Sequence, residues 1–270
     1  MAPLGQALSV EVRSKTFPAI GGRDENAVLR NVKFSVAPRS FVVITGPSGC
    51  GKSTLLNIVA GIDKDFEGKI DLGPGKPRMT FIFQTPRLLP WRTVRQNLEL
   101  ALPPRDPRLA LIPEMLERVG LTAAANAYPE HISLGMQRRA ALARGFITEP
   151  DILLMDEPFV SLDDPTAQDL RELLIDLWSR RPTTVLFITH DRVEAVMLAT
   201  RVTVDADVPL ATGRVGINYM DVDSIAAALK QGKSTVGRPV MGRKLKAPLF
   251  GMATPIYDGQ KRIVGALYGI

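Results

Sequence analysis

The stretch SFVVITGPSGCGKSTLLNIVAG, residues 40–61, decides the fold of this chain. Its opening run, Phe41–Ile44, is β-branched and aromatic and predicts a buried strand. The next eight residues, Gly46–Ser53, match the pattern G-x-x-x-x-G-K-[ST] in full, and Ser53–Ala60 predicts a helix. Strand, glycine loop and helix in this order form the context in which the pattern binds phosphate. The stretch therefore predicts an α/β fold built around a phosphate-binding loop.

The chemistry of this loop follows from its residue types. Glycines let backbone N–H groups converge on phosphate oxygens, and the helix N-terminus adds a positive dipole. We expect Lys52 to reach the β- and γ-phosphates and Ser53 to ligate Mg²⁺. The residues expected to contact the nucleotide here are Gly46, Pro47, Ser48, Gly49, Cys50, Gly51, Lys52, Ser53 and Thr54.

A second Gly-Lys-Ser-Thr occurs at Gly232–Thr235. The position that needs the first glycine is occupied by Ala227, and the preceding residues 224–230 predict a helix rather than a strand. Gly232 is typical of a helix C-cap, and Pro239 argues against a long helix afterwards. We interpret this copy as a chance match that binds no phosphate.

Two further apolar runs end in polar side chains suited to nucleotide chemistry. The run Asp151–Pro158 predicts a strand that delivers Asp156 for Mg²⁺ coordination and Glu157 for activation of water. The run Thr184–Ile188 predicts another strand, and His190 follows it. Because ligands collect at the carboxyl ends of parallel strands, His190 is expected to meet the γ-phosphate.

Phe81–Phe83 also predicts a short strand, and Gln84 ends it. A glutamine in this place could contact the metal or the attacking water, although on its own it is more typical of a surface loop.

Composition bounds the remaining possibilities. With one cysteine, Cys50, and two histidines in 270 residues, the chain excludes an internal disulfide framework and argues against a zinc site. No stretch has the length and apolarity of a transmembrane helix, and the N-terminus lacks the apolar core of a secretory signal. The net charge of +6 comes from basic residues spread along the chain, so we infer no nucleic-acid partner.

Five segments occur in one order: GPSGCGKST, FIFQ, HISLGMQRR, ILLMDEP followed by SLDD, and FITHD. Together they resemble the ATPase subunit of an ABC transporter, over about residues 10–204. The run from Gln84 to Val94 is most similar to importers of small anions such as nitrate, sulfonates and taurine. The resemblance implies a P-loop NTPase core with an antiparallel β subdomain and a helical subdomain.

The resemblance also implies ATP and Mg²⁺ as cofactors and a head-to-tail homodimer that holds two ATP molecules at its interface. Transmembrane permease subunits and, through them, a solute-binding protein are the implied partners. The implied location is the cytoplasmic face of the inner membrane. The transported solute cannot be read from this chain, because specificity in the family lies in other subunits.

By position, residues 133–137 are the signature segment that contacts the ATP of the partner subunit, through Ser133, Gly135 and Gln137. Asp163 belongs to the loop that crosses the dimer interface. Phe17 matches the aromatic residue that stacks on adenine, and a stacking platform needs only a π-face. Leu134 departs from the family, where glycine is usual, and we expect a signature that still closes.

The chain divides, in this interpretation, into an ATPase domain, 1–204, and a segment 205–270 that is not typical of the family. Arg108–Gly120 and Pro165–Arg180 predict helices from their apolar spacing. In the tail, residues 253–267 predict a hairpin around an Asp-Gly turn. The order of the tail resembles the distal half of a Cache-type sensor domain and predicts a small α+β segment.

Three interpretations of the tail stay open: a regulatory addition, a fusion from a rearranged gene, and a divergent ATPase tail. We favour the fusion.

Two functions other than importer ATPase also stay open. One is a sensor or adaptor whose tail binds a small ligand while the ATPase is idle. The other is an ABC ATPase without a permease, although such proteins usually carry two ATPase units in one chain.

Overall fold

A computed structural model describes residues 6–18, 26–46, 48–191, 194–195 and 198, together with the strand segments 235–236, 240–241, 248–249, 252–257 and 263–269. The chain forms two compact units, residues 1–190 and 191–270, and each is considered by itself. The boundary expected from the sequence at residue 204 lies outside the described residues and stays a prediction.

An antiparallel sheet opens the first unit. It consists of β1 (Leu8–Phe17), β2 (Asn26–Val36) and β4 (Glu67–Asp71) in the order β2-β1-β4. Leu8, Val10 and Val12 alternate with more exposed residues and are at most 1% exposed, so one face of this sheet packs on the core. The antiparallel subdomain expected from the resemblance is confirmed.

A parallel sheet carries the expected strands. It consists of β3 (Phe41–Thr45), β5 (Met79–Ile82), β6 (Ile152–Asp156) and β7 (Thr184–Thr189) in the order β3-β7-β6-β5. The β6 run Ile152–Met155 is fully buried, as a strand covered on both faces requires. The registers pair Thr45 with Thr189 and Asp156 with Ile188, so the carboxyl ends of β3, β6 and β7 meet at one edge.

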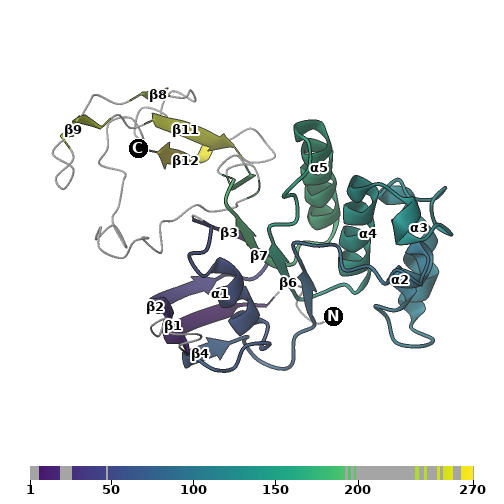
Figure 1. The fold of residues 1–270 in the computed structure, drawn as a ribbon, viewed down its shortest axis with the longest axis horizontal. Coiled ribbons are helices and arrows are strands. Elements are labelled where there is room, and N and C mark those ends of the chain that lie inside the picture. The colour runs from purple at the N-terminus through teal and green to yellow at the C-terminus, as the bar shows by residue number, and fades with distance from the viewer. Residues whose placement is uncertain are drawn as a thin grey trace. The chain divides into compact units, whose positions relative to one another are not determined.

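Helix α1 (Lys52–Val59) packs between the two sheets, because one hydrophobic core contains residues of β1, β2, α1, β6 and β7. Helix α5 (Asp164–Arg180) confirms the predicted helix at 165–180. Its Trp178 meets Phe41 of β3 edge to face at 5.8 Å between ring centroids. The parallel sheet thus has a helix on each face, and Figure 1 shows α2–α5 gathered on the side of the unit away from β1, β2 and β4.

The helical subdomain contains α2 (Val94–Glu99), η1 (Pro107–Leu111), α3 (Ile112–Arg118), η2 (Pro129–His131) and α4 (Leu134–Ile147). The single helix expected over 108–120 is wrong in one respect: a 3₁₀ turn and an α-helix divide it. Pro113 provides the reason. It has no N–H for a continuous hydrogen-bond ladder, so it stands in the first turn of a new helix.

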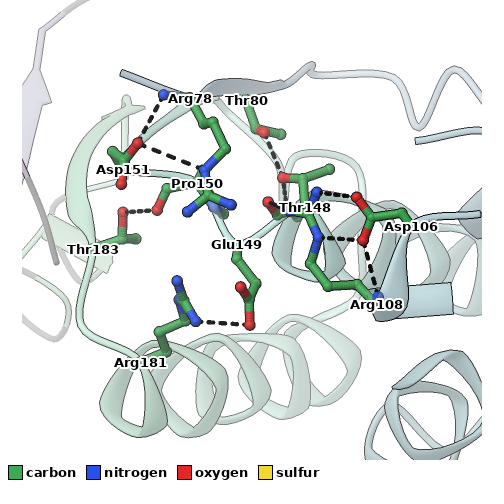
Figure 2. Close-up of polar contacts among 11 residues, drawn as sticks. Arg78, Thr80, Asp106, Arg108, Thr148, Glu149, Pro150, Asp151, Arg181 and Thr183 are labelled. Carbon is green, nitrogen blue, oxygen red and sulfur yellow. Dashed lines mark hydrogen bonds and ion pairs between the residues drawn. The ribbon is translucent and has the colours of Figure 1, made fainter. Parts of the chain in front are cut away.

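The connection from α4 to β6, residues 148–151, is held from three sides (Figure 2). Arg108 of η1, itself paired with Asp106, donates to the carbonyl of Thr148. Arg181, which follows α5, pairs with Glu149 at 2.7 Å, and Asp151 accepts from the backbone N–H of Arg78. A polar network therefore fixes the end of α4 to the sheet.

From residue 235 onward, the described residues of the second unit lie in strands. β11 (Met252–Tyr257) pairs antiparallel with β12 (Ile263–Gly269) and with β8 (Thr235–Val236). A second pair joins β9 (Val240–Met241) and β10 (Pro248–Leu249). The hairpin strands are confirmed, whereas the Asp-Gly turn lies outside the described residues.

The second Gly-Lys-Ser-Thr also falls in this unit. Thr235 begins β8, whereas Thr54 of the first copy lies inside α1. A phosphate loop requires a helix at this point, so the strand supports our interpretation of a chance match. The helix expected at 224–230 lies outside the described residues.

None of the helices in the described part of the chain is both long enough and apolar enough to cross a membrane.

Candidate functional site

The phosphate-binding loop connects β3 to α1, as predicted. Gly49 and Gly51 adopt left-handed backbone conformations, with φ of 79° and 97°, which glycine adopts without strain. A Cβ on Gly46 would come within 3.1 Å of the Cys50 sulfur, so the loop closes tightly on itself. Pro47 lies outside the described residues. Ser48 and Gly49 are exposed at the tip of the loop.

Lys52 begins α1 and is 7% exposed. Its ammonium donates to the carbonyl of Gly46 at 3.0 Å and lies 3.6 Å from a carboxylate oxygen of Glu157. The lysine therefore spans the mouth of the loop, where a phosphate group would receive its charge.

Asp156 and Glu157 leave β6 on the side of this loop. The Ser53 hydroxyl donates to Asp156 at 3.0 Å, which joins the first turn of α1 to the end of β6. Burial raises the pKa of Asp156, and the charge of Glu157 acts in the same direction, whereas the Ser53 hydrogen bond and Lys52 oppose this shift.

Glu157 and His190 form a pair. The Nδ1 atom of His190 lies 2.8 Å from one oxygen of Glu157, whose other oxygen faces Lys52. Glu157 has a φ of 43° and donates its backbone N–H to Ile188 of β7. A left-handed conformation costs energy in a residue with a side chain, so the fold holds this carboxylate in one place.

The oxygens at this edge suit Mg²⁺. Two ligands at right angles around Mg²⁺, each at about 2.1 Å, lie about 3.0 Å apart. The Ser53 hydroxyl and Asp156 carboxylate are separated by 3.0 Å. No cluster of three or more His, Cys, Asp or Glu side chains exists among the described residues. A metal here would accordingly rely on a hydroxyl, one carboxylate, phosphate and water, which are donors typical of Mg²⁺.

Gln84 follows β5 by two residues and is exposed. Two arginines of α4 hold its loop through backbone carbonyls. Arg138 donates to the carbonyls of Gln84 and Val160, and Arg144 donates to those of Pro86 and Arg87. Both arginines have pKa values lowered by burial. The loop that bears Gln84 is therefore fixed to the same helix that begins with the signature segment.

Phe17 lies close to the level of the phosphate loop along the β1–β2 hairpin. A Cβ on Gly51 would come within 2.7 Å of the Val28 side chain, so the loop touches β2. Across the hairpin, Thr16 pairs with Ala27 and Phe17 with Asn26. Phe17 thus lies within two residues, or about 7 Å, of the level at which β2 meets the loop. Its side chain is 40% exposed.

The signature residues gather at the start of α4. Ser133 is the N-cap and accepts from the backbone N–H of Met136, and Gln137 donates to the carbonyls of Pro129 and Ile132. Leu134 is 40% exposed and begins the helix in a conformation that leucine adopts without strain. A leucine side chain here therefore projects to the surface instead of disturbing the backbone.

Gly135 lies against α5, because a Cβ there would come within 2.9 Å of the Thr166 methyl group. Asp163 caps α5 and accepts from the backbone N–H of Thr166. Hydrogen bonding from the Thr166 side chain, and then from its backbone N–H, lowers the pKa of the Asp163 carboxyl. Among the described residues, the contacts given above for Ser133, Gly135, Gln137 and Asp163 are with the start of α4, the start of α5 and the turn before α4. None of these contacts is with the phosphate loop. The structure thus separates the predicted residues into two groups.

A groove of about 370 Å³ lies between the edge strand β5 and helices α2 and α4. Phe81, Phe83 and Leu100 provide apolar walls, and Arg144 and Asn97 provide polar ones. The groove adjoins the Gln84 loop, because Phe83 and Pro86 line it.

Sequence reasoning missed three residues that shape this region: Arg138, Arg144 and Lys15. Arg138 and Arg144 are arginines on a helix otherwise rich in buried alanine, which is a signal for buried polar contacts. Lys15 is a lysine at 3% exposure in a strand whose other inward residues are apolar. The alternation of Leu8, Val10 and Val12 would place Lys15 on the opposite face, and only the structure shows the register irregularity between Val12 and Ser14 that precedes it.

Comparisons with known proteins agree with this geometry. The family model described as ABC transporter matches residues 29–160. An aliphatic sulfonates import ATP-binding protein, SsuB of Bacillus subtilis (strain 168), is 41% identical over 199 residues, which cover 71% of this chain and 77% of that protein. SsuB 1 of Streptomyces avermitilis is 47% identical over 184 residues, covering 68% and 69%.

Among solved structures, a dimeric ATP-binding cassette in a post-hydrolysis state, bound to ADP and Pi, superposes with a TM-score of 0.60 at 30% identity. The match covers 70% of this chain and 90% of that one.

Proposed function

The chain belongs to the ATP-binding subunits of ABC transporters, and from this premise we propose that it hydrolyses ATP to power the import of an aliphatic sulfonate. The observation that carries the proposal is the assembly at one sheet edge of the phosphate loop, the Ser53–Asp156 pair and the Glu157–His190 pair. The sulfonate is taken from the names of the relatives, which are import proteins for aliphatic sulfonates. It is one of the small anions expected from the sequence.

In this proposal each side chain at the edge has one role. Lys52 and the loop N–H groups bind and orient the phosphates, and Ser53, Asp156 and Gln84 hold Mg²⁺, which neutralises phosphate charge when bound. Glu157 accepts a hydrogen bond from the attacking water and orients it. His190, held by Glu157 through Nδ1, presents its other ring nitrogen toward the γ-phosphate. Orientation and charge neutralisation contribute most of the rate.

The second group of residues supports a partner subunit. Ser133, Gly135 and Gln137 lie at the start of α4, and Asp163 caps the neighbouring helix α5. Since these residues have no described contact with the phosphate loop of their own chain, we propose that they complete the ATP site of a second copy in a head-to-tail homodimer. The dimeric form of the similar cassette supports this arrangement.

The groove beside the Gln84 loop is the proposed contact for the permease. Its floor is the edge strand β5, and one wall is the helix that carries Arg138 and Arg144. Binding of the permease in the groove would shift Gln84, because both arginines hold the Gln84 loop. A solute-binding protein would act through the permease, and the chain would work at the cytoplasmic face of the membrane.

Transport by reconstituted complexes tests this function. The chain, the permease of the same organism and its solute-binding protein would be placed in proteoliposomes with ATP inside. We expect accumulation of an alkanesulfonate that requires ATP and is lost with Glu157→Gln. Accumulation of nitrate but not of alkanesulfonate would refute the solute, and ATP hydrolysis without uptake of any anion would refute the importer.

The sensor alternative concerns the tail. Three of the described strands form an antiparallel sheet in the order β12-β11-β8, and β9 and β10 form a separate pair. The likeness to a Cache-type domain stays a prediction, and stabilisation of the full chain by a small ligand, lost after removal of residues 205–270, would support it.

A further inference from the structure

Lys15 is a cation at an inward position of β1. Leu8, Val10 and Val12 precede it on the core face of the sheet, and a register irregularity at Lys15/Thr16 follows. Its side chain is 3% exposed. A buried ammonium is costly unless it is paired and hydrogen-bonded, so its neighbours must compensate for the lost water.

Two aspartates and a carbonyl supply that compensation. The ammonium donates to Asp63 at 3.0 Å, to the carbonyl of Asp65 at 2.5 Å and to the Asp65 carboxylate at 3.3 Å. Asp63 is the stronger partner, because its side chain is 20% exposed whereas that of Asp65 is 90% exposed. These three acceptors use all the donors of a lysine ammonium.

The same ammonium lies over the ring of Phe17, 4.7 Å from its centroid. Phe17 follows Lys15 by two residues, and the contact shows that the two side chains meet despite the register irregularity between Lys15 and Thr16. The ring is 40% exposed, although a phenylalanine at the surface gains little from being there. The ammonium and the π-electrons of the ring attract each other, and this attraction restrains the orientation of the Phe17 side chain.

These contacts tie the hairpin to both ends of α1. At the N-terminus of α1, Gly51 packs against Val28 of β2. Beyond its C-terminus, Asp63 and Asp65 hold Lys15 of β1. The phosphate loop and the Phe17 ring are therefore fixed to the same helix, and their separation cannot change without breaking one of these contacts.

We propose that Lys15 is a positioning residue of the nucleotide site, which holds the Phe17 ring as a rigid platform for the base of the bound nucleotide. The inference rests on the proposed function, because it takes ATP as the ligand. Lys15 contacts no part of the nucleotide itself. Lys15 restrains the Phe17 ring before the nucleotide binds. The ring therefore loses less conformational entropy when a base stacks on it.

The test compares a ligand with a base and one without. Kd values for ATP and for inorganic triphosphate, both with Mg²⁺, would be measured by calorimetry on the full chain and on Lys15→Met, which keeps the aliphatic length. We expect ATP to bind about three- to tenfold more weakly to Lys15→Met. Triphosphate binding should not change, because the phosphate loop is intact.

A matched control and a milder variant accompany this measurement. Lys33→Met removes a lysine from the same hairpin, where it is 74% exposed and paired with Glu11, and should change neither Kd. Asp63→Asn leaves Lys15 in place but loosens it, and should weaken ATP binding in the same direction by a smaller factor. In a Phe17→Leu background, Lys15→Met should have no further effect on ATP.

The contrary outcomes separate the two proposals. An unchanged Kd for ATP in Lys15→Met, or equal weakening for ATP and triphosphate, would overturn the positioning role while the ATP site stands. Wild-type protein that binds ATP no more tightly than triphosphate would overturn Phe17 as the base platform, and Lys15 with it. Failure to bind either ligand would refute the proposed ATP site.

Discussion

At the scale of single residues, the carboxylate of Glu157 has the most constrained position in the site. One oxygen faces Lys52 and the other is hydrogen-bonded to His190, and the backbone is left-handed. These contacts hold the carboxylate in one orientation before a water molecule binds to it, so little of the reorganisation cost remains at the moment of reaction.

We expect Glu157→Gln to reduce kcat for ATP hydrolysis by about 100-fold or more, because the amide cannot accept a proton from the attacking water. The Kd for ATP should stay close to that of the wild type. Steady-state phosphate release and calorimetry measure the two quantities. Glu114→Gln, at an exposed ion pair on α3, is the matched control. Turnover near the wild-type rate in Glu157→Gln would rule out this role.

At the scale of elements, α4 is the component on which most of the site depends. Its first residues form the signature, its arginines hold the Gln84 loop, and its end is fixed to β6 by the network of Figure 2. A displacement of α4 would therefore reach the signature, the glutamine and the strand that carries Asp156.

The close approach of α4 and α5 gives a first prediction about α4. Gly135→Ala would place a methyl group 2.9 Å from that of Thr166 and should lower the free energy of unfolding by about 1–3 kcal/mol. Adding Thr166→Ser removes the opposing methyl group and should recover most of the loss, with Thr166→Ser alone as control. Urea unfolding measures all three. A double variant no more stable than Gly135→Ala would show that the contact is unimportant.

The far end of α4 gives a pH prediction. The hydrogen bonds from Arg108 lower the pKa of Asp106 to about 2 from 3.8. A carboxyl group with a lowered folded-state pKa stabilises the fold above the unfolded-state value, and this contribution is lost as the pH falls from 3.8 through 2.

Asp106→Asn should therefore be less stable than the wild type at pH 5 and should approach it in stability toward pH 2. Thermal unfolding between pH 2 and pH 5 measures the difference. Asp176→Asn, at an exposed ion pair with Arg180, should show a much smaller change. A difference for Asp106→Asn that does not depend on pH would contradict the ion pair as its cause.

At the scale of the whole molecule, the two groups of site residues predict an ATP-dependent dimer. Full-length Glu157→Gln should be monomeric alone and dimeric with ATP, as measured by size exclusion with light scattering. Leu134 should not prevent closure, since it is exposed and fits the helix. A monomer that still binds ATP would contradict this, and Leu134→Gly and a chain ending at residue 204 would then identify whether the leucine or the tail is responsible.

Much of the fold was predictable because its signals are local. A glycine pattern between an apolar run and a helix defines β3, the loop and α1, and two more apolar runs define β6 and β7. The helix at 108–120 was predicted as one piece, because apolar spacing does not record that Pro113 restarts the hydrogen-bond ladder.

The sequence by itself determined the chemical types of the site residues: a lysine and a serine in a glycine loop, and carboxylates and a histidine at strand ends. Only the tertiary structure decided which of these residues meet. It brings Ser53 to Asp156 and Glu157 to His190, residues 103 and 33 positions apart, and leaves the signature residues in a separate group. It also placed Lys15 under Phe17 and Arg138 on Gln84. The physical reason is that residue type and local spacing fix strands, loops and helices, whereas contacts between distant segments follow from how those elements pack.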